Sequence, residues 1–301
     1  EGAPKGVMLT HRNLIANIDG TLEVFPNHAY SCIVGFLPFF HSFGFMATLW
    51  LPLIHGIRGI YHANPLEPKV IGKLVEDYRG TLMIGTSTFM QGFIRRCEPE
   101  QLASLEFVVC GAEKLAPRVR LAFKERFGVE PLEGYGTTEC APAVAANIPD
   151  CESPGFFSPG TKHGTIGRPI PGVEVKVVDP DTNEERPSNM EGLLLVKGPN
   201  IMQGYLNQPA RTAEVLRDGW YSTGDIAKVD GDGFITITDR LARFSKVAGE
   251  MVPHTKVEEI LHGLLGLNEQ RLAVASVPDP QKGERLVVLH TLREEEMEQL
   301  L

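Results

Sequence analysis

The sequence contains few cysteines and no dense run of basic residues. Its five cysteines, Cys32, Cys97, Cys110, Cys140 and Cys151, are scattered, odd in number and never spaced as Cys-x-x-Cys. We therefore expect neither a disulfide framework nor a zinc site, and a reducing cytoplasm as the compartment. The formal net charge of -9, without a basic cluster, argues against nucleic acid as the partner.

Long uninterrupted apolar runs are also missing. The longest apolar stretch, residues 36–54, is interrupted by prolines and by polar or small residues: Pro38, His41, Ser42, Gly44 and Pro52. A membrane-spanning helix needs about 20 consecutive apolar residues. We predict that this stretch instead forms core that lines a pocket.

The composition that is present indicates a folded protein. The chain has 301 residues, of which 43% are hydrophobic and 22% charged, which predicts more than one domain. Apolar faces with helical spacing predict helices over 70–78 and 119–127, and short apolar runs predict buried strands over 81–85 and 105–111. This alternation is typical of an α/β fold with a parallel sheet covered by helices.

The local amino-acid composition changes near residue 155, where proline and glycine become frequent. Short strands bounded by turn residues are predicted at 173–178, 192–196 and 234–238. After Arg240 the sequence predicts a helix near 257–265 and strands at 273–277 and 286–292. The predicted division is an α/β part (1–154), a β-rich subdomain (155–240) and a partial α+β domain (241–301).

The first residues, 2–13, place Lys5 among small residues and Thr10 ahead of a helical run. Small residues let the backbone approach phosphate oxygens, lysine supplies a compact positive charge, and threonine caps helices. This pattern indicates polyphosphate binding, although its spacing is not that of a Walker loop. An ordinary turn with a solvated lysine is the alternative for this segment taken alone.

Seven runs, in this order and spacing, resemble the adenylate-forming superfamily, the acyl and aryl ligases related to luciferase. They are residues 2–13, 39–44 (Phe-Phe-His-Ser-Phe-Gly), 111–115 (Gly-Ala-Glu-Lys-Leu), 134–139 (Gly-Tyr-Gly-Thr-Thr-Glu), 164–169 (Gly-Thr-Ile-Gly-Arg-Pro), 220–225 (Trp-Tyr-Ser-Thr-Gly-Asp), and Asp239-Arg240 leading to Lys246 and Gly249. The resemblance covers nearly the whole chain. It implies a layered α/β large domain with a small β-barrel subdomain, followed by a truncated α+β C-terminal domain.

Such enzymes bring a carboxylate to the α-phosphate of ATP, so their sites need cations, a metal and oriented donors. The resemblance implies that Gly134, Tyr135 and Gly136 flank the adenine, that Thr138 touches the α-phosphate, and that Glu139 holds Mg²⁺. Read without the other runs, residues 135–139 are also consistent with a tight loop ending in a helix cap. The implied nucleotide-binding set further includes Lys5, Gly111, Ala112, Thr137, Asp225 and Arg240.

Asp225 would bind the ribose hydroxyls, because an ionised carboxylate accepts two hydrogen bonds from a vicinal diol. Arg240 would reach the ribose or the phosphates from the next strand. An exposed turn is the alternative for Asp225.

His41 would lie at the junction of phosphate and acyl group, as a catalytic residue. A satisfied core histidine among phenylalanines is the alternative. The residues that would line the acyl pocket, each of which could instead be simple core, are Phe43, Met46, Thr86, Ser87, Met90 and Gly111.

Lys246 and Gly249 would follow the hinge on which the C-terminal domain swings between the two half-reactions. Lys246 is included among the catalytic residues, whereas the hinge position itself is Ala242 rather than the usual aspartate or lysine. The family's adenylation lysine lies in a Gly-Lys context near the end of that domain. We expect it beyond Leu301, and we expect the phosphate loop to begin before residue 1.

Among family members, the chain most resembles the acyl-carrier-protein synthetase half of bifunctional 2-acylglycerophosphoethanolamine acyltransferases. The residues that carry this resemblance are 139–142, 197–202, 204–206 and 243–252. It implies that a fatty acid and ATP form acyl-AMP, which the phosphopantetheine thiol of acyl carrier protein then attacks. Work at the inner face of the cytoplasmic membrane, through partners or fused segments, is also implied.

A basic landing surface is expected for the acidic carrier protein, and its candidates on one helical segment are Arg118, Arg120, Lys124 and Arg126. A solvated helix face is the better explanation for these four residues. A long-chain acyl-CoA synthetase, with CoA as the thiol acceptor, is the first alternative. A nucleotide- or acyl-binding fragment without turnover is the second.

Overall fold

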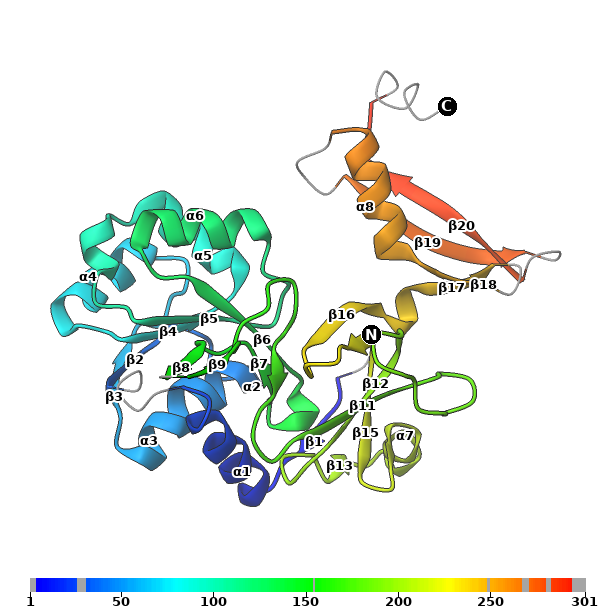
Figure 1. The fold of residues 1–301 in the computed structure, drawn as a ribbon, viewed down its shortest axis with the longest axis horizontal. Helices are drawn as coiled ribbons and strands as arrows, with labels where there is room; N and C mark the ends of the chain where they lie inside the picture. The colour runs from blue at the N-terminus through cyan, green and yellow to red at the C-terminus, as the bar shows by residue number, and fades with distance from the viewer. Residues whose placement is uncertain are drawn as a thin grey trace.

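The computed structural model describes residues 4–25, 31–153, 155–247, 250–266, 271–279 and 283–293. Its largest element is a seven-stranded sheet in the order β10-β7-β6-β5-β4-β2-β3 (Figure 1). The strands are β2 (Cys32–Gly35), β3 (Arg58–Tyr61), β4 (Leu82–Gly85), β5 (Phe107–Cys110), β6 (Pro131–Gly136), β7 (Ala143–Ala146) and β10 (Arg168–Pro169). The first five run parallel, whereas β7 and β10 are antiparallel to their neighbours.

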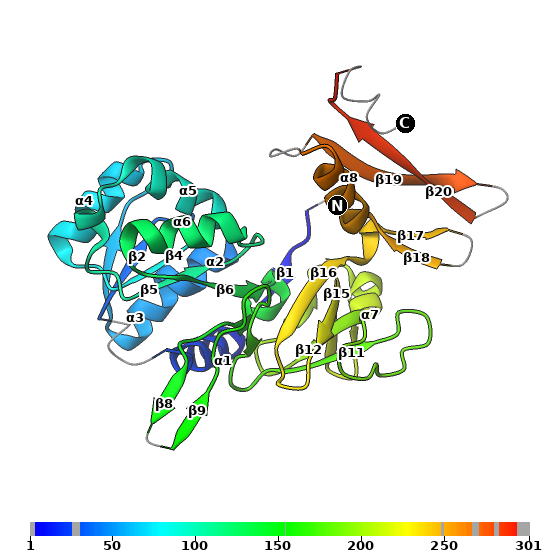
Figure 2. The same cartoon turned by 45° about the horizontal axis from the view of Figure 1, so that its top comes forward.

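Helices cover both faces of this sheet, as Figures 1 and 2 show. One layer contains α4 (Pro68–Tyr78), α5 (Ser87–Arg96), the short η3 (Pro99–Leu102) and α6 (Pro117–Phe127). The other contains α1 (His11–Leu22), α2 (Ser42–Gly44), the π-helical turn η2 (Phe45–Trp50) and α3 (Leu51–His55). The predicted α/β class, with a parallel sheet between helices, is confirmed.

Local sequence signals explain where these helices begin and end. Thr10 caps α1 by accepting a hydrogen bond from the Asn13 backbone, and the Asn13 side chain accepts one from the Thr10 backbone in return. Pro117 occupies the first turn of α6, and Gly128 ends that helix with a φ of 77°. The fully buried side chains between the layers include Phe36, Met83, Met90, Phe93 and Phe123.

A second, antiparallel sheet of five strands occupies the place of the predicted β-barrel subdomain. It contains β11 (Glu174–Val178), β12 (Gly192–Lys197), β14 (Leu216–Arg217), β15 (Trp220–Val229) and β16 (Ile235–Arg240). Beside it lie the pair β1 (Val7–Met8) and β13 (Gly204–Tyr205), the helix α7 (Pro209–Val215) and the short η4 (Thr138–Cys140). The hairpin of β8 (Cys151–Ser153) with β9 (Phe156–Ser158) lies apart from this sheet, on the side of the large sheet (Figures 1 and 2). The domain boundary near 154 stays a prediction, and β10 joins the large sheet from beyond it.

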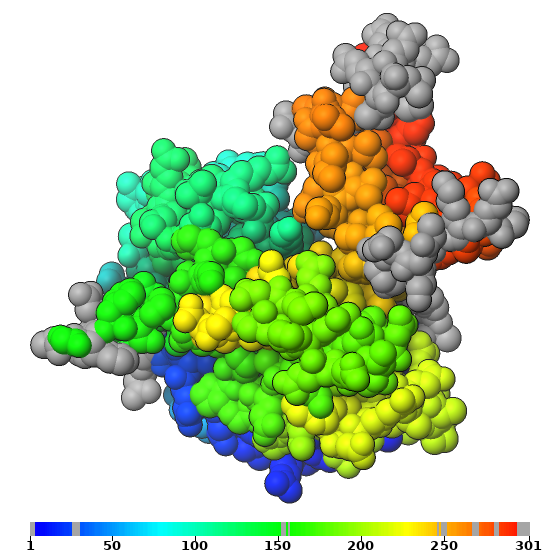
Figure 3. All heavy atoms as spheres, turned by 45° about the vertical axis from the view of Figure 1, so that its right-hand side comes forward, coloured from blue at the N-terminus to red at the C-terminus, as the bar shows by residue number. Residues whose placement is uncertain are grey.

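The short helix η5 (Leu241–Arg243) leads from β16 to a C-terminal unit. This unit contains β17 (Phe244–Val247), β18 (Glu250–Pro253), α8 (His254–Leu264), β19 (Leu272–Asp279) and β20 (Gly283–His290), with its four strands in one sheet. In the space-filling view this unit, orange to red, rises from the yellow and green residues (Figure 3). None of the helices in the described ranges is both long and apolar enough to cross a membrane.

Candidate active site

Two adjoining cavities open where the parallel strands end. Their volumes are about 390 and 520 Å³. The carboxyl ends of parallel strands are where open α/β sheets bind ligands. The residues that line both cavities come mainly from the end of β6 and the loop after β5, and are Ala112, Gly134, Tyr135, Gly136, Thr137 and Arg240.

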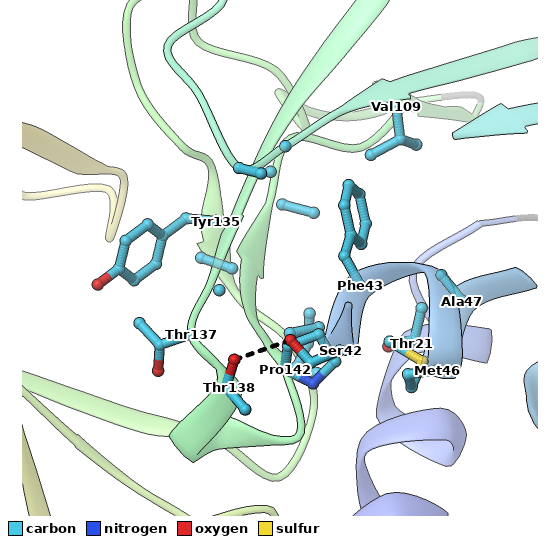
Figure 4. Close-up of a pocket in the computed structure, with 18 of the residues that line it drawn as sticks. Thr21, Ser42, Phe43, Met46, Ala47, Val109, Tyr135, Thr137, Thr138 and Pro142 are labelled. Carbon is cyan, nitrogen blue, oxygen red and sulfur yellow. Dashed lines mark hydrogen bonds between the residues drawn. The ribbon is translucent and has the colours of Figure 1, made fainter. Parts of the chain in front are cut away.

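The smaller cavity has an apolar end between the sheet and the layer of α1. Phe43 and Met46 line it as predicted, together with Ala47 on the π-helical turn (Figure 4). Turns of this kind are frequent at functional sites. Other apolar residues of this wall come from the end of α1, from α3 and from strands β4 and β5: Val24, Phe25, Leu51, Leu82, Ile84 and Val109.

The opposite end of this cavity carries charged and hydroxyl groups. Lys5, Thr138 and Glu139 all line it. The Lys5 Nζ atom lies 3.8 Å from Glu139 Oε1, and the Ser42 hydroxyl is hydrogen-bonded to the Thr138 hydroxyl at 3.0 Å (Figure 4). The structure therefore brings three distant sequence runs to one place: 2–13 with Lys5, 39–44 with Ser42, and 134–139 with Thr138 and Glu139.

His41 lies in the same cavity at the start of α2. Its Nδ1 accepts a hydrogen bond from the Phe43 backbone at 3.2 Å. In the neutral ring, this bond leaves the proton on Nε2. The alternative that His41 is a buried core histidine is wrong, because the residue is exposed.

Asp225 lines the larger cavity. It lies in β15 and is 4% exposed, so the exposed-turn alternative is wrong. Its Oδ2 accepts a short hydrogen bond from the Tyr135 hydroxyl, and its Oδ1 lies 3.2 Å from Arg240 Nε. Burial raises the pKa of the Asp225 carboxyl above its ordinary value, although Tyr135 and Arg240 act in the opposite direction.

Tight backbone packing shapes the end of β6. A Cβ atom on Gly136 would lie 2.2 Å from the Pro142 carbonyl oxygen, so only glycine fits there without a backbone shift. The Thr137 backbone N–H donates to that same carbonyl at 2.9 Å. This bond positions Thr137 between the two cavities.

Three predicted pocket residues lie elsewhere. Thr86, Ser87 and Met90 do not line either cavity, so the prediction that they form the acyl wall is not met for these two cavities. Thr86 caps α5 through the Phe89 backbone, while Ser87 and Met90 are buried at 4% and 0% exposure. Ser87 and Met90 therefore belong to the buried side of α5, which the strand-end pattern alone does not reveal.

Glu113 and Glu133 add carboxylates to the larger cavity. Burial would raise the pKa of Glu113, but hydrogen bonds from Thr86 and Thr88 lower it overall. Burial raises the pKa of Glu133, which accepts a hydrogen bond from the Leu115 backbone at 3.2 Å. The sequence runs include Glu113 but give no signal for Glu133.

The structure describes only some of the predicted hinge and lid residues. Ala242 lies exposed in η5 between the two units. The backbone of Lys246 pairs with Met251 between β17 and β18. The Lys246 side chain and Gly249 lie outside the described residues, so their roles stay predictions.

The basic face of α6 is largely paired within the molecule. Glu130 pairs with both Arg120 and Lys124. The Arg126 guanidinium donates to the Cys97 carbonyl oxygen at 2.7 Å and lies 3.4 Å from the Glu98 carboxylate. These pairings reduce the positive charge that this face offers an acidic partner.

The sequence reasoning missed two groups of residues. Thr21, Val24 and Phe25 form one wall of the smaller cavity, although only the amphipathic pattern of α1 hints at an inward face. Tyr205 was also not selected, yet its hydroxyl donates to Glu139 Oε1 at 2.8 Å. The pairing of β1 with β13, and a hydrogen bond from the Met202 backbone N–H to the Glu139 carbonyl oxygen, bring Tyr205 to this place.

The donor set fits a magnesium ion held mainly by a nucleotide. Among the described residues, no group of three or more His, Cys, Asp or Glu side chains could hold a metal. Mg²⁺ in nucleotide sites needs only one or two protein carboxylates besides the phosphates. Glu139 supplies such a carboxylate next to Lys5.

Known proteins resemble this chain over most of its length. The long-chain-fatty-acid–CoA ligase of Salmonella typhimurium is 35% identical over 288 residues, which are 94% of this chain and 49% of that protein. The ligase of the same name from Bacillus subtilis is 33% identical, over 97% of this chain and 51% of its own length. A feruloyl-CoA synthase from Amycolatopsis is 33% identical, over 94% and 56%. The chain thus spans about half the length of the curated relatives it matches.

Solved structures and a family model agree with these relatives. ATP-bound MatB from Rhodopseudomonas palustris matches with a TM-score of 0.82 at 26% identity, covering 99% of this chain and 59% of MatB. O-succinylbenzoate Coenzyme A synthetase (MenE) from B. subtilis, in complex with AMP, has a TM-score of 0.78 at 22% identity over 98% and 59% of the two chains, a likeness of fold alone. The model described as AMP-binding enzyme matches residues 1–206, more than half of the chain. This chain therefore belongs to the AMP-binding enzyme family.

Proposed function

We propose that the protein activates a fatty acid as its acyl-adenylate with ATP and transfers the acyl group to coenzyme A. The observation that carries this proposal is the smaller cavity, which is apolar at one end and ends at Lys5, Thr138 and Glu139. An apolar wall favours an alkyl chain by about 0.8 kcal/mol for each buried methylene. The polar end suits the carboxylate and the phosphates that must meet it.

The nucleotide would occupy the larger cavity and extend into the smaller one. Both are lined by Gly134, Tyr135, Gly136 and Thr137, the segment proposed to flank the adenine and the phosphates. Asp225 opens onto the larger cavity, where its carboxylate would accept hydrogen bonds from the ribose diol. Arg240 would reach the ribose or the phosphates from β16.

The proposed chemistry has two steps. A carboxylate oxygen of the fatty acid attacks the α-phosphorus of ATP, and pyrophosphate leaves. The sulfur of the acceptor thiol then attacks the acyl carbonyl carbon, and AMP leaves with the bonding electron pair while the thiol proton passes to solvent or a base. No residue of the chain becomes acylated.

The residues at the polar end would hold two anions close together. Lys5 would neutralise phosphate charge, and Thr138 would donate its hydroxyl to the α-phosphate while Ser42 holds that hydroxyl. His41, with its proton on Nε2, would donate toward the oxygen atoms at the junction. Mg²⁺, when bound through Glu139 and the phosphates, would supply charge neutralisation.

Coenzyme A is proposed as the acceptor rather than acyl carrier protein. The curated relatives quoted above carry names of CoA ligases or synthases. In addition, the face of α6 expected to receive the carrier protein is paired with Glu130 and Glu98. Acyl carrier protein remains the alternative that the experiment must separate.

The test uses the full protein with ATP, Mg²⁺ and palmitate, and offers CoA and holo acyl carrier protein in parallel. Mass spectrometry of the thioesters should show acyl-CoA, and omission of ATP should abolish it. Acylation of the carrier protein alone would favour the alternative. No acyl-adenylate and no thioester with either acceptor would refute the proposal and favour a binding fragment without turnover.

A matched pair of variants links the activity to the cavity. Replacing Met46 by Trp enlarges a side chain that is buried at 1% exposure on the apolar wall. We expect the preference to shift toward shorter acids, with the rate for palmitate falling more than the rate for octanoate. Leu53→Trp, at a side chain that is 64% exposed on α3, should leave the ratio unchanged.

A further inference from the structure

Tyr205 lies where two distant segments meet at the polar end of the smaller cavity. Its strand β13 pairs with β1, so that Val7 lies opposite Tyr205 and Met8 opposite Gly204. The Leu206 backbone N–H also donates to the Gly6 carbonyl oxygen at 2.7 Å. These bonds hold the segment that carries Lys5 against the strand that carries Tyr205.

The Tyr205 side chain contacts both charged groups of this end. Its hydroxyl donates to Glu139 Oε1 at 2.8 Å, and its ring centroid lies 5.2 Å from Lys5 Nζ. Tyr205 is 3% exposed and the Glu139 side chain is 11% exposed, so the hydrogen bond between them is shielded from water. A hydrogen bond to a charged acceptor and a cation over an aromatic face are both favourable in such a setting.

These contacts restrict the conformations of the Lys5 and Glu139 side chains. Lysine has a long flexible stem, and the Lys5 side chain is 40% exposed, so it needs a contact to define its direction. A carboxylate can rotate about its last bond, and a hydrogen bond to Oε1 defines the direction of Oε2 as well. Glu139 and Lys5 lie 3.8 Å apart as an ion pair, so a change in the direction of either side chain changes the charge that the other one faces.

We propose that Tyr205 is the positioning residue for the phosphate-and-metal end of the site: its hydroxyl orients Glu139 for Mg²⁺, and its ring holds Lys5 for the phosphates. This inference rests on the proposed function. The hydroxyl is assigned to metal-dependent binding, whereas the ring and the strand are assigned to holding the Lys5 segment. Tyr205 itself would touch neither the acid nor the adenine.

The two parts of the side chain can be separated by two substitutions. Tyr205→Phe removes the hydroxyl and keeps the ring, and Tyr205→Leu removes both. Tyr78→Phe, at a residue that is 55% exposed at the end of α4, is the matched control. Calorimetry would measure a non-hydrolysable ATP analogue with Mg²⁺, and AMP with a chelator.

We expect Tyr205→Phe to weaken binding of the magnesium-bound analogue about tenfold, since the lost hydrogen bond involves a charged group. Its affinity for AMP without metal should stay within twofold of the unmodified protein, as should both affinities of Tyr78→Phe. Tyr205→Leu should also speed hydrogen–deuterium exchange of the peptide that contains residues 5–9, which Tyr205→Phe should leave protected.

Three outcomes would overturn the inference. Equal binding of the magnesium-bound analogue by Tyr205→Phe and the unmodified protein would show that the hydroxyl does not orient Glu139. A parallel loss of AMP affinity would indicate a general packing role. If the unmodified protein bound neither nucleotide, the proposed function itself would fail, and the inference with it.

Discussion

At the scale of single residues, the burial and the contacts of Asp225 predict a specific effect on nucleotide binding. Its two carboxylate oxygens already contact Tyr135 and Arg240, and it is almost fully buried. If Asp225 accepts hydrogen bonds from the ribose diol as proposed, Asp225→Asn should weaken AMP binding about 10- to 100-fold, because the acceptor loses its charge. Calorimetry with AMP measures this change.

A ligand control tests whether the loss involves the ribose. The unmodified protein should bind 2′-deoxy-AMP more weakly than AMP, whereas Asp225→Asn should bind the two nearly equally. If the deoxy analogue loses the same factor in both proteins, Asp225 does not contact that hydroxyl.

The pH dependence of AMP binding should follow the same carboxyl. Burial raises the pKa of Asp225 above the ordinary value of about 3.9, so its proton returns at a higher pH than for an exposed aspartate. The AMP dissociation constant should rise as the pH falls through this raised value. Asp225→Asn should show no such rise over the same pH range.

The linked effect on stability has the opposite sign. A raised pKa in the folded state means that folding favours the protonated carboxyl, so the stabilisation from Asp225 is largest below its unfolded pKa and is lost as the pH rises through its folded pKa. At neutral pH, Asp225→Asn should therefore melt at a temperature no lower than the unmodified protein. A clear loss of melting temperature would contradict this sign.

At the scale of elements, the junction of β6 and β7 should tolerate no side chain larger than hydrogen at Gly136. The Cβ of alanine would lie 2.2 Å from the Pro142 carbonyl oxygen. We expect Gly136→Ala to lower the free energy of unfolding by about 2–4 kcal/mol and to weaken AMP binding, because the backbone beside Thr137 must move. Denaturant unfolding and calorimetry would measure both.

Gly92→Ala is the matched control for that prediction. Gly92 lies inside α5, and its added Cβ would meet only Pro68 at an ordinary 3.7 Å. Alanine favours a helix over glycine, so stability should rise by about 0.5–1 kcal/mol. If both variants lost similar stability, close packing at Gly136 would not be the cause.

The spacing of apolar residues along the sequence predicts some helices and strands of this fold but not all of its strand pairings. The helices predicted over 70–78 and 119–127 are confirmed as α4 and α6, since each has an apolar face and a proline near its start. The strands predicted over 81–85 and 105–111 are confirmed as β4 and β5. The pairing of the two-residue strands β1 and β13 carries no such pattern, because it joins segments about 200 residues apart.

At the scale of the whole molecule, the C-terminal unit joins the rest through η5. Contacts across this connection include Thr255 N–H to Asp239 Oδ2 at 3.0 Å and the exposed ion pair of Lys114 with Glu259 at 3.4 Å. Exposed ion pairs contribute at most about 1 kcal/mol. Brief trypsin digestion should therefore cut first after Arg243 and release the C-terminal unit.

The remaining fragment should keep its affinity for AMP, because Tyr135, Asp225 and Arg240 precede the cut. Arg243→Gln should suppress that cleavage, as read by mass spectrometry of the fragments. An equally early cut within α6, whose Arg126 is held by the Cys97 carbonyl oxygen, would contradict a weak connection at η5.

The family, the α/β class and most of the polar residues around the cavities could be predicted from the sequence. Lys5, Thr138, Glu139 and Asp225 are recognisable because seven short motifs follow one another along the chain, whereas the Lys5 segment alone would also fit an ordinary turn. Helix boundaries are local, because capping and periodicity act within a few residues. The motifs and the helix boundaries could therefore be predicted from the sequence.

The residues that form the cavity walls and the partners of the charged side chains depend on the tertiary structure. In the structure, Thr86, Ser87 and Met90 are not among the residues that line the two cavities, whereas Val24 and Phe25 are. Arg120 and Arg126 of α6 are paired within the molecule. The tertiary structure also brings Tyr205 to Glu139 across 66 residues of chain. Such contacts depend on how layers pack and strands pair, and no local pattern records the direction of a side chain relative to a distant element.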